Sequence, residues 1–281
     1  MRKIFPYLIA FLFIWIFLAQ CIIFRNRWGD NKAYRVFASK KVSLKIYDTL
    51  IDKHHLHYAI SGSDSLPTLV FVHGSPGSWM NYMIYMCDTT LQRRFRMISI
   101  DRPGFGYSDF GKALHLKEQC NLLLPVLQSL KTNQPMYLCG HSMGGPVAVQ
   151  LAASDPDLFK TIIIAAGSLD IQQEKEETWR KVMNVKPLYW LLPGAFAPSN
   201  TELLYLKKDL IPLQEEFRKI TCNVYFIHGD KDDWVPIQNV QYGRSMMVNA
   251  RSITIDTIFG AGHLFPWKNK EEFTRLLLKL N

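Results

Sequence analysis

The chain has 281 residues, a net charge of +9, and 48% hydrophobic and 13% aromatic residues. This composition excludes an intrinsically disordered chain, because enough apolar surface is available to offset the entropy lost on folding. Its 16 glycines and 14 prolines are ordinary numbers and exclude a collagen-like or low-complexity chain, and the length suits one large domain or two small ones.

The positive charge is concentrated near the N-terminus. Residues 1–45 hold nine of the 33 basic and one of the 24 acidic residues, which leaves 24 basic and 23 acidic residues in the rest of the chain. A nucleic-acid-binding protein is expected to carry a basic surface on its folded body. The charge distribution therefore predicts no nucleic-acid partner, and it favours an anionic membrane surface beside the N-terminal segment.

Residues 4–24 form an apolar run without a charged residue, interrupted only by Pro6 and Gln20. A helix of this length would span about 31 Å, and the hydrocarbon core of a bilayer is about 30 Å thick. A core helix of a soluble protein normally has one polar face, which this run lacks. We therefore predict that residues 1–24 form a single-pass N-terminal transmembrane anchor and that residues 4–24 bind the membrane.

Two other interpretations of this segment remain open. A cleaved export signal would have a shorter apolar core and small residues at the cleavage site, where only Ala19 fits. The sequence from Leu18 to Cys21 resembles a bacterial lipobox, which would place a lipid on Cys21, although Gln20 stands where a small residue is expected. The side of the membrane also stays open, because the basic flank favours the cytoplasm whereas the Met-Arg-Lys start resembles an export signal.

Residues 25–41 are predicted to form a polar, basic stalk that leads into one domain over 42–281. From residue 42, short runs rich in β-branched residues alternate with helical stretches, which predicts an α/β fold with a mostly parallel central sheet flanked by helices. The first two runs predict an antiparallel pair at an edge. The expected strands are 42–47, 56–60, 69–72, 97–100, 136–139, 162–166, 224–227 and 253–258, and the expected helices are 80–93, 114–130, 146–153, 235–247 and 270–280.

Nearly sixty residues separate the strands expected at 162–166 and 224–227, where a single crossover helix would suffice. A connection of that length is usually functional. We predict that residues 168–220 form a helical cap insertion over the carboxyl edge of the sheet. Its apolar side chains are expected to pack against what lies beneath the cap: Trp179, Tyr189, Trp190, Phe196 and Tyr205.

A G-x-S-x-G sequence, Gly140 to Gly144, follows the strand expected at 136–139 and precedes a helix. In this context the serine lies at a sharp turn that exposes its hydroxyl group at the sheet edge. The flanking residues must be glycines, because Cβ atoms there would collide with the neighbouring strand and helix. Ser142 is therefore the predicted nucleophile.

A serine nucleophile needs a base and an acid that orients the base. His263, in a glycine-flanked loop after the last expected strand, is the predicted base. The acid should follow a strand between Ser142 and His263, and a loop after the strand at 224–227 offers three candidates, with Asp170 as an alternative elsewhere. Those three are Asp230, Asp232 and Asp233.

Acyl transfer also requires donors for the oxyanion that forms on the attacked carbonyl. The sequence His73-Gly74-Ser75-Pro76-Gly77 follows the first buried strand. The predicted oxyanion hole consists of the backbone N–H groups of Ser75 and of Met143, the residue after the nucleophile.

Together these motifs resemble the α/β-hydrolase fold superfamily, in its cap-bearing branch, over about residues 45–281. HGSPG at 73–77 is similar to the family's oxyanion loop, DRPGFGYSD at 101–109 to its turn after the next strand, and GAGH at 260–263 to its histidine loop. GDKDDWVP at 229–236 is similar to a family motif that places the triad acid on Asp232. Haloalkane dehalogenases and epoxide hydrolases of this fold carry aspartate at the elbow, where this chain has Ser142.

The predicted function is therefore a serine hydrolase that uses Ser142, His263 and Asp232 for acyl-enzyme chemistry on a carboxylic ester. The substrate class is a small-molecule or lipid ester. No metal cluster or phosphate-binding glycine loop is recognisable in the sequence, so no cofactor is expected. Hydrolysis of a C–C bond or acyl transfer on the same triad, and a non-catalytic binding module tethered to a membrane, are the alternatives.

Overall fold

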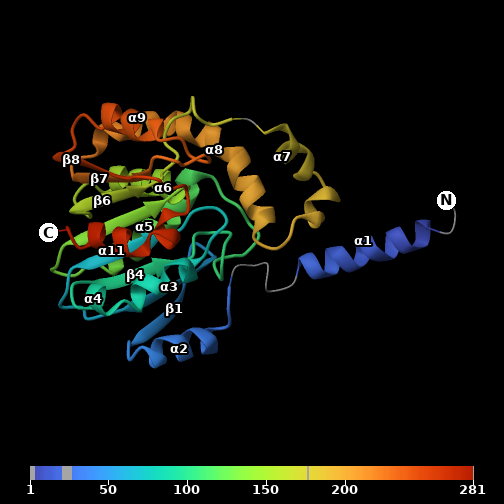
Figure 1. Cartoon of the computed structure of the whole chain (residues 1–281), viewed down its shortest axis with the longest axis horizontal. Coiled ribbons are helices and arrows are strands. Elements are labelled where there is room, and N and C mark those ends of the chain that lie inside the picture. The colour runs from blue at the N-terminus through green and yellow to red at the C-terminus, as the bar shows by residue number, and fades with distance from the viewer. Residues whose placement is uncertain (1–3, 21–26, 176, 281) are drawn as a thin grey trace.

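A computed structural model of the chain describes residues 4–20, 27–175 and 177–280. Its centre is a sheet of eight strands in the order β1-β2-β4-β3-β5-β6-β7-β8 (Figure 1). Strands β3 to β8 run parallel to one another, whereas β2 is antiparallel to both β1 and β4, so the expected antiparallel pair at one edge is confirmed. The strands are β1 Leu44–Ile51, β2 His54–Ser61, β3 Thr68–Val72, β4 Arg96–Ile100, β5 Met136–His141, β6 Thr161–Ala165, β7 Asn223–Gly229 and β8 Ser252–Ile258.

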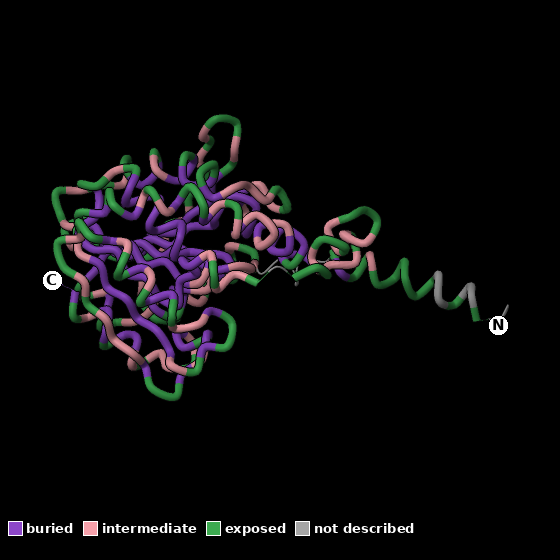
Figure 2. Tube along the Cα trace, turned by 90° about the horizontal axis from the view of Figure 1, so that it is seen from above, coloured by how far each residue is buried: buried purple, intermediate pink, exposed green. Residues whose placement is uncertain are grey.

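The central strands are buried on both faces, which explains their continuous apolar sequences. Alternate residues of one strand enter two different cores: Val70 and Val72 of β3 face one layer of helices, and Leu69 and Phe71 face the other. The sheet is therefore the middle layer of three, and Figure 2 shows buried residues through the centre of the body.

One face of the sheet is covered by α5 (Leu116–Ser129), α6 (Gly144–Ser154) and α9 (Gln238–Met246). The other face is covered by short elements near the ends of the chain and after β3. These are α2 (Asp30–Ser39), η2 (Trp79–Tyr82), α3 (Met83–Met86), α4 (Thr89–Gln92), α10 (Phe265–Lys268) and α11 (Lys270–Leu277).

The helix expected over 80–93 is divided into η2, α3 and α4. The carboxylate of Asp88 accepts hydrogen bonds from the backbone N–H groups of Thr90 and Leu91, at 3.0 and 3.3 Å, and thereby caps α4 as a new helix. The apolar spacing continues through Asp88, so periodicity alone predicts one helix here. The cap made by Asp88 instead starts a new helix at Thr89.

The segment between β6 and β7, residues 166–222 and called here the inserted segment, contains α7 (Thr178–Met183), η3 (Leu188–Leu191), α8 (Phe196–Glu216) and η4 (Phe217–Lys219). Helix α8 is long. Its side chains Leu206, Leu210 and Leu213 belong to the same apolar core as the buried side chains of α5 and α6. By contrast, the side chains of Trp179 and Trp190 are about half exposed. Phe196 is exposed to the same extent, whereas the ring of Tyr205 stacks on that of His115 at 4.0 Å, so the five side chains expected to pack over the body differ in their burial.

The region predicted as a polar stalk, residues 25–41, differs from that expectation. Residues 25 and 26 lie outside the described residues, and helix α2 follows with Ala33 and Phe37 fully buried. These two residues are four apart and therefore lie on the same helix face, and the ring of Phe37 lies 6.4 Å from that of Trp79. Helix α2 is thus part of the folded body.

The single helix predicted over residues 4–24 is not confirmed. Helix α1 covers Phe5–Ala19, 15 residues, or about 22 Å of helix. Its C-terminal end is hydrogen-bonded to the inserted segment. The Gly194 N–H donates to the Ala19 carbonyl at 2.8 Å, and the side-chain amide of Gln20 donates to the Trp190 carbonyl at 3.3 Å. Within the described ranges, no helix is both long and apolar enough to cross a bilayer. Cys21, the residue of the lipobox interpretation, lies outside those ranges.

Candidate active site

Ser142 lies in the turn between β5 and α6, with a backbone φ of +54°. Such a left-handed conformation is strained for a residue with a side chain and is typical of a nucleophile elbow. A Cβ at Gly140 would overlap the carbonyl oxygen of Gly144, and a Cβ at Gly144 would overlap that of Val72. The steric reason given for the glycines in the motif therefore holds at both positions.

Asp232 and His263, predicted as acid and base, lie in contact at the carboxyl ends of β7 and β8. The Nδ1 atom of His263 is 2.8 Å from Asp232 Oδ2. The other carboxylate oxygen, Oδ1, accepts the backbone N–H groups of Trp234 and Val235 at 3.0 and 2.9 Å. The carboxylate is thus held by its own loop, and its hydrogen bond to a histidine is the one with His263; His228 Nε2 lies farther from the same oxygen, at 3.5 Å.

The environment keeps this carboxylate ionised. Burial opposes its charge, but the hydrogen bond to His263, the charge of that histidine and the N–H group of Val235 outweigh the burial. The pKa of Asp232 is therefore below its ordinary value, and an ionised Asp232 requires a proton on Nδ1 of His263. In the neutral form of His263, Nε2 is then the nitrogen that carries the lone pair.

The competing acids have other partners. Asp230 Oδ1 accepts the N–H of Gly260 at 2.6 Å, and Asp170 Oδ1 accepts the N–H of Gln172 at 2.9 Å. No hydrogen bond to His263 is made by either residue in the described part of the chain. Of the acids considered from the sequence, Asp232 is the one that contacts the histidine.

His141, which precedes the serine, holds the histidine loop in place. Its Nε2–H donates to the carbonyl of His263 at 3.0 Å, and the two imidazole rings lie 4.8 Å apart. Burial and the nearby charge of His263 lower the pKa of His141 to about 3, so its ring is neutral. The described structure contains no direct hydrogen bond from Ser142 Oγ to His263, although the contact made by His141 brings the two loops together.

The predicted oxyanion donors belong to two segments that meet at Ser142. Met143 follows it directly, and a Cβ added to Gly74 would lie 2.9 Å from the Cβ of Ser142, so the loop that contains Ser75 abuts the serine. Neither the Ser75 N–H nor the Met143 N–H donates to another described residue. Two unpaired N–H groups beside a serine hydroxyl can stabilise an anionic oxygen.

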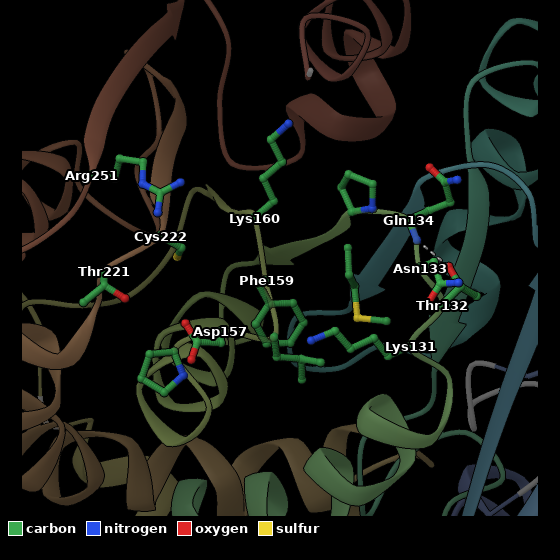
Figure 3. Close-up of a pocket in the computed structure, with 14 residues that line it drawn as sticks. Lys131, Thr132, Asn133, Gln134, Asp157, Phe159, Lys160, Thr221, Cys222 and Arg251 are labelled. Atoms are coloured by element: carbon green, nitrogen blue, oxygen red, sulfur yellow. Dashed lines mark hydrogen bonds between the residues drawn. The ribbon is translucent and has the colours of Figure 1, made fainter.

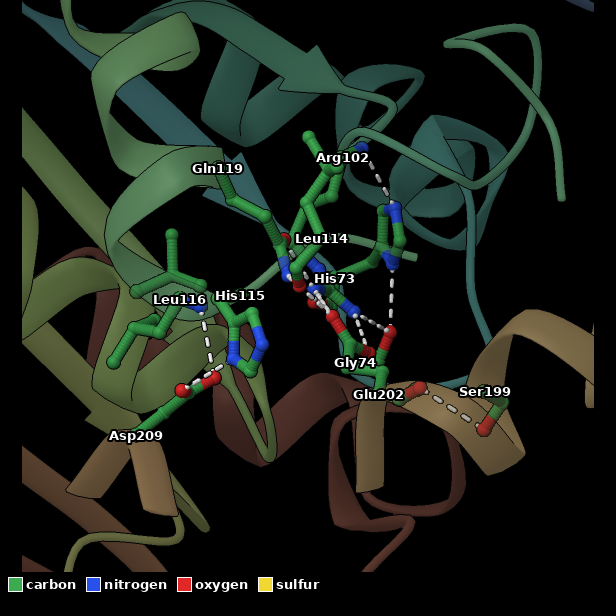
Figure 4. A network of polar contacts seen from close by, with 12 residues as sticks. His73, Gly74, Arg102, Leu114, His115, Leu116, Gln119, Ser199, Glu202 and Asp209 are labelled. Carbon is green, nitrogen blue, oxygen red and sulfur yellow. Dashed lines mark hydrogen bonds and ion pairs between the residues drawn. The ribbon is translucent and has the colours of Figure 1, made fainter. Parts of the chain in front are cut away.

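A buried network that the sequence analysis missed lies behind this loop (Figure 4). It joins Arg102, two residues after the end of β4, to Glu202 of α8 and to the carbonyl oxygens of His73 and Gly74. The motif at 101–109 pointed to a turn but gave Arg102 no role. Glu202 lies in a helix whose sequence carries no motif, so only the fold brings it to the site.

No group of three or more His, Cys, Asp and Glu side chains that could hold a metal ion occurs among the residues the structure describes. A hollow of about 500 Å³ lies at the opposite, amino-terminal edge of β5, β6 and β7 (Figure 3). It is lined by Lys131, Lys160 and Arg251 among others and contains none of the predicted site residues.

The elbow gives a first testable prediction. We expect Gly144→Ala to destabilise the fold by about 2–4 kcal/mol, because the added methyl group meets backbone atoms that cannot move aside. Gly29→Ala is the control, since nothing lies within 4 Å of its Cβ position, and we expect a loss below about 1 kcal/mol. Denaturant unfolding measures both, and equal losses would contradict the steric explanation.

Comparison with known proteins agrees with this architecture. The family described as alpha/beta hydrolase fold matches residues 67–192. YugF, an uncharacterized hydrolase of Bacillus subtilis (strain 168), is 23% identical over 79% of this chain and 91% of that protein. A candidate esterase/lipase of Haemophilus influenzae is 22% identical over 93% of this chain and 94% of its own length.

Among solved structures, a bacterial membrane phospholipase A superposes with a TM-score of 0.68 and 16% identity over 99% of this chain and 97% of that one. At this identity the similarity concerns the fold, and it agrees with the strand order and the layered helices described above. The chain therefore has the α/β-hydrolase fold, with an eight-stranded, mostly parallel sheet flanked by helices.

Proposed function

We propose that the protein is a serine hydrolase that acts on carboxylic esters. The observation that carries this proposal is the buried Asp232–His263 pair, 2.8 Å apart, beside a serine in a strained turn. The two unpaired backbone N–H groups next to that serine complete the set that acyl transfer requires. Similarity to hydrolases, including a candidate esterase/lipase, supports the same reaction class.

In the proposed reaction, Ser142 Oγ attacks the ester carbonyl while Nε2 of His263 takes the hydroxyl proton. The N–H groups of Ser75 and Met143 bind the oxyanion, and its collapse expels the alcohol, which receives that proton from His263. A water molecule then attacks the acyl-enzyme with the same histidine as base, which releases the acid and restores Ser142. Asp232 keeps the proton on Nδ1 throughout.

The proposed triad does not by itself determine which ester is the substrate. That selection depends on the residues that surround the site. We propose that the helices within residues 168–220 act as a cap that shapes the substrate pocket. The names of the relatives and of the superposed phospholipase support small-molecule or lipid esters.

We propose further that helix α1 binds a lipid surface. Most of its described side chains are apolar and exposed; for example, Phe11 and Phe13 are each about two-thirds exposed. Exposed apolar side chains gain free energy when they leave water, at about 25 cal/mol per Å². Three basic residues beside the apolar run in the sequence, Arg2, Lys3 and Arg25, would favour anionic headgroups.

The triad is tested by substitution and labelling. We expect Ser142→Ala and Asp232→Asn to lower kcat for p-nitrophenyl butyrate by about 10⁴-fold, and Ser142→Ala to abolish labelling by a fluorophosphonate probe. Asp170→Asn is the matched control and should retain wild-type kcat, because Asp170 does not contact His263. Full activity in Ser142→Ala would exclude the proposed mechanism.

Lipid binding is tested by sedimentation of the full chain with vesicles that contain phosphatidylglycerol. We expect Phe11→Asp/Phe13→Asp to weaken the partition by at least about tenfold, because two exposed aromatic groups are replaced by charges. Leu50→Asp is the control, since Leu50 is an equally exposed apolar residue on β1, far along the chain from α1. Equal binding of all three proteins would argue against a role for α1.

A further inference from the structure

The peptide group between Gly74 and Ser75 carries one of the two proposed oxyanion donors. This peptide is trans, because the cis bonds of the described chain lie at Ser75–Pro76 and Lys186–Pro187. In a planar trans peptide the C=O and the N–H bonds point in opposite directions. Whatever holds the Gly74 carbonyl therefore decides where the Ser75 N–H points.

Two side chains hold that carbonyl. The Gly74 oxygen accepts the Nδ1–H of His73 at 2.7 Å and an Nη2–H of Arg102 at 3.0 Å. The tautomer of His73 is settled by its other nitrogen, because Nε2 accepts the backbone N–H of Arg102 at 3.0 Å. Burial and then the charge of Arg102 move the pKa of His73 well below its ordinary value, so the ring stays neutral.

Arg102 is itself held on every side (Figure 4). Its Nε–H donates to the His73 carbonyl at 2.9 Å, and one Nη1–H donates to Gln119 Oε1 at 2.8 Å. The remaining N–H groups, one on each terminal nitrogen, donate to the two carboxylate oxygens of Glu202. All five donors of the guanidinium group are thus paired, and its plane cannot turn without breaking several bonds.

Glu202 belongs to helix α8 of the inserted segment, and both ionic side chains are at most 1% exposed. Its carboxylate also accepts a hydrogen bond from the Gln119 amide at 2.7 Å. A second link joins the same helix to the same loop, since Ser75 Oγ donates to Ser199 Oγ at 2.9 Å. Helix α8 is therefore linked to the loop of Gly74 and Ser75 twice, through Arg102 and through the Ser75 hydroxyl group.

We propose that Arg102 and Glu202 are positioning residues that fix the orientation of the Gly74–Ser75 peptide, so that the Ser75 N–H faces the carbonyl oxygen under attack. Arg102 holds the Gly74 oxygen, and Glu202 holds Arg102 from helix α8. The orientation of an oxyanion donor thereby depends on the position of the inserted segment. This inference rests on the proposed serine-hydrolase function.

The test uses the full chain with Arg102→Met/Glu202→Leu, which removes both charges together. Replacing a buried ion pair by apolar side chains of similar size is often neutral for stability, so a Tm near that of the wild type is expected. We expect kcat for p-nitrophenyl butyrate to fall about 10- to 100-fold at a KM within about twofold, because the donor remains but is no longer aimed. The Ki of a trifluoromethyl ketone, which forms a tetrahedral adduct with the serine, should rise by the same factor as kcat/KM falls.

The matched control is His115→Gln/Asp209→Asn. His115 Nδ1 lies 2.8 Å from Asp209 Oδ1, so this pair also joins α8 to the body but does not touch the oxyanion loop. We expect its kcat and its Ki for the ketone to stay within about twofold of the wild type. Equal losses in the two double variants would overturn the proposal, because the pair would then only hold α8 in place. Wild-type kcat and Ki in Arg102→Met/Glu202→Leu would overturn it as well.

Should the double variant not fold, Glu202→Gln carries the test. Its amide oxygen can accept one of the two bonds from Arg102, so a smaller fall in kcat, about three- to tenfold, is expected at unchanged KM; an unchanged kcat would overturn the proposal. Failure of the proposed function itself is distinguishable, since the wild type would then neither turn over the ester nor be labelled at Ser142 by a fluorophosphonate probe.

Discussion

The close approach of strand β5, helix α6 and strand β3 is the constraint on which the rest of the site depends. The approach is limited by backbone atoms, since a Cβ at Gly140 or Gly144 would overlap a carbonyl oxygen. With no room for side chains on either side, the chain reverses direction within a few residues, and Ser142 takes the left-handed conformation at the top of the turn. The same approach brings the loop after β3 against Ser142, so the sheet places the proposed nucleophile and the proposed oxyanion loop side by side.

Polar contacts join the body of the protein to helix α8 of the inserted segment. The bonds from Arg102 to Glu202 of helix α8 are buried, where an unpaired charge would be costly, and the bond from Ser75 to Ser199 is partly buried. Helix α8 also joins the apolar core through Leu206 and Leu210. The inserted segment is therefore secured to the body by both kinds of contact, whereas its outer elements, α7 and η3, contribute no fully buried side chain.

Much of the sheet could be predicted from the sequence because each central strand is a continuous apolar run bounded by turn residues. Ser142 and Met143 follow from one local motif, and the loops that contain Asp232 and His263 follow from their places after expected strands. Local sequence left the acid open among three neighbours, and the resemblance to a known family selected Asp232, which contacts the histidine in the structure.

The sequence was less informative wherever a contact between distant segments decides the structure. Helix α1 ends at Ala19 beside Gly194, which is 175 positions away, so the apolar run overstates the length of that helix. The basic character of residues 25–41 concealed the two apolar residues, Ala33 and Phe37, that bury helix α2. The pairing of Arg102 with Glu202 has no local pattern at all, because the two residues are 100 positions apart and belong to different layers.

The bond from His141 to the His263 carbonyl has a consequence for precision. Ser142 and His263 are far apart in the sequence. The distance between two such residues normally depends on the positions of all the elements between them. Here His141, the residue before the serine, donates a hydrogen bond to the backbone carbonyl of His263. Ser142 and His263 are therefore connected through a few bonds as well as through the chain. We therefore expect small displacements of the sheet to move Ser142 and the backbone of His263 together.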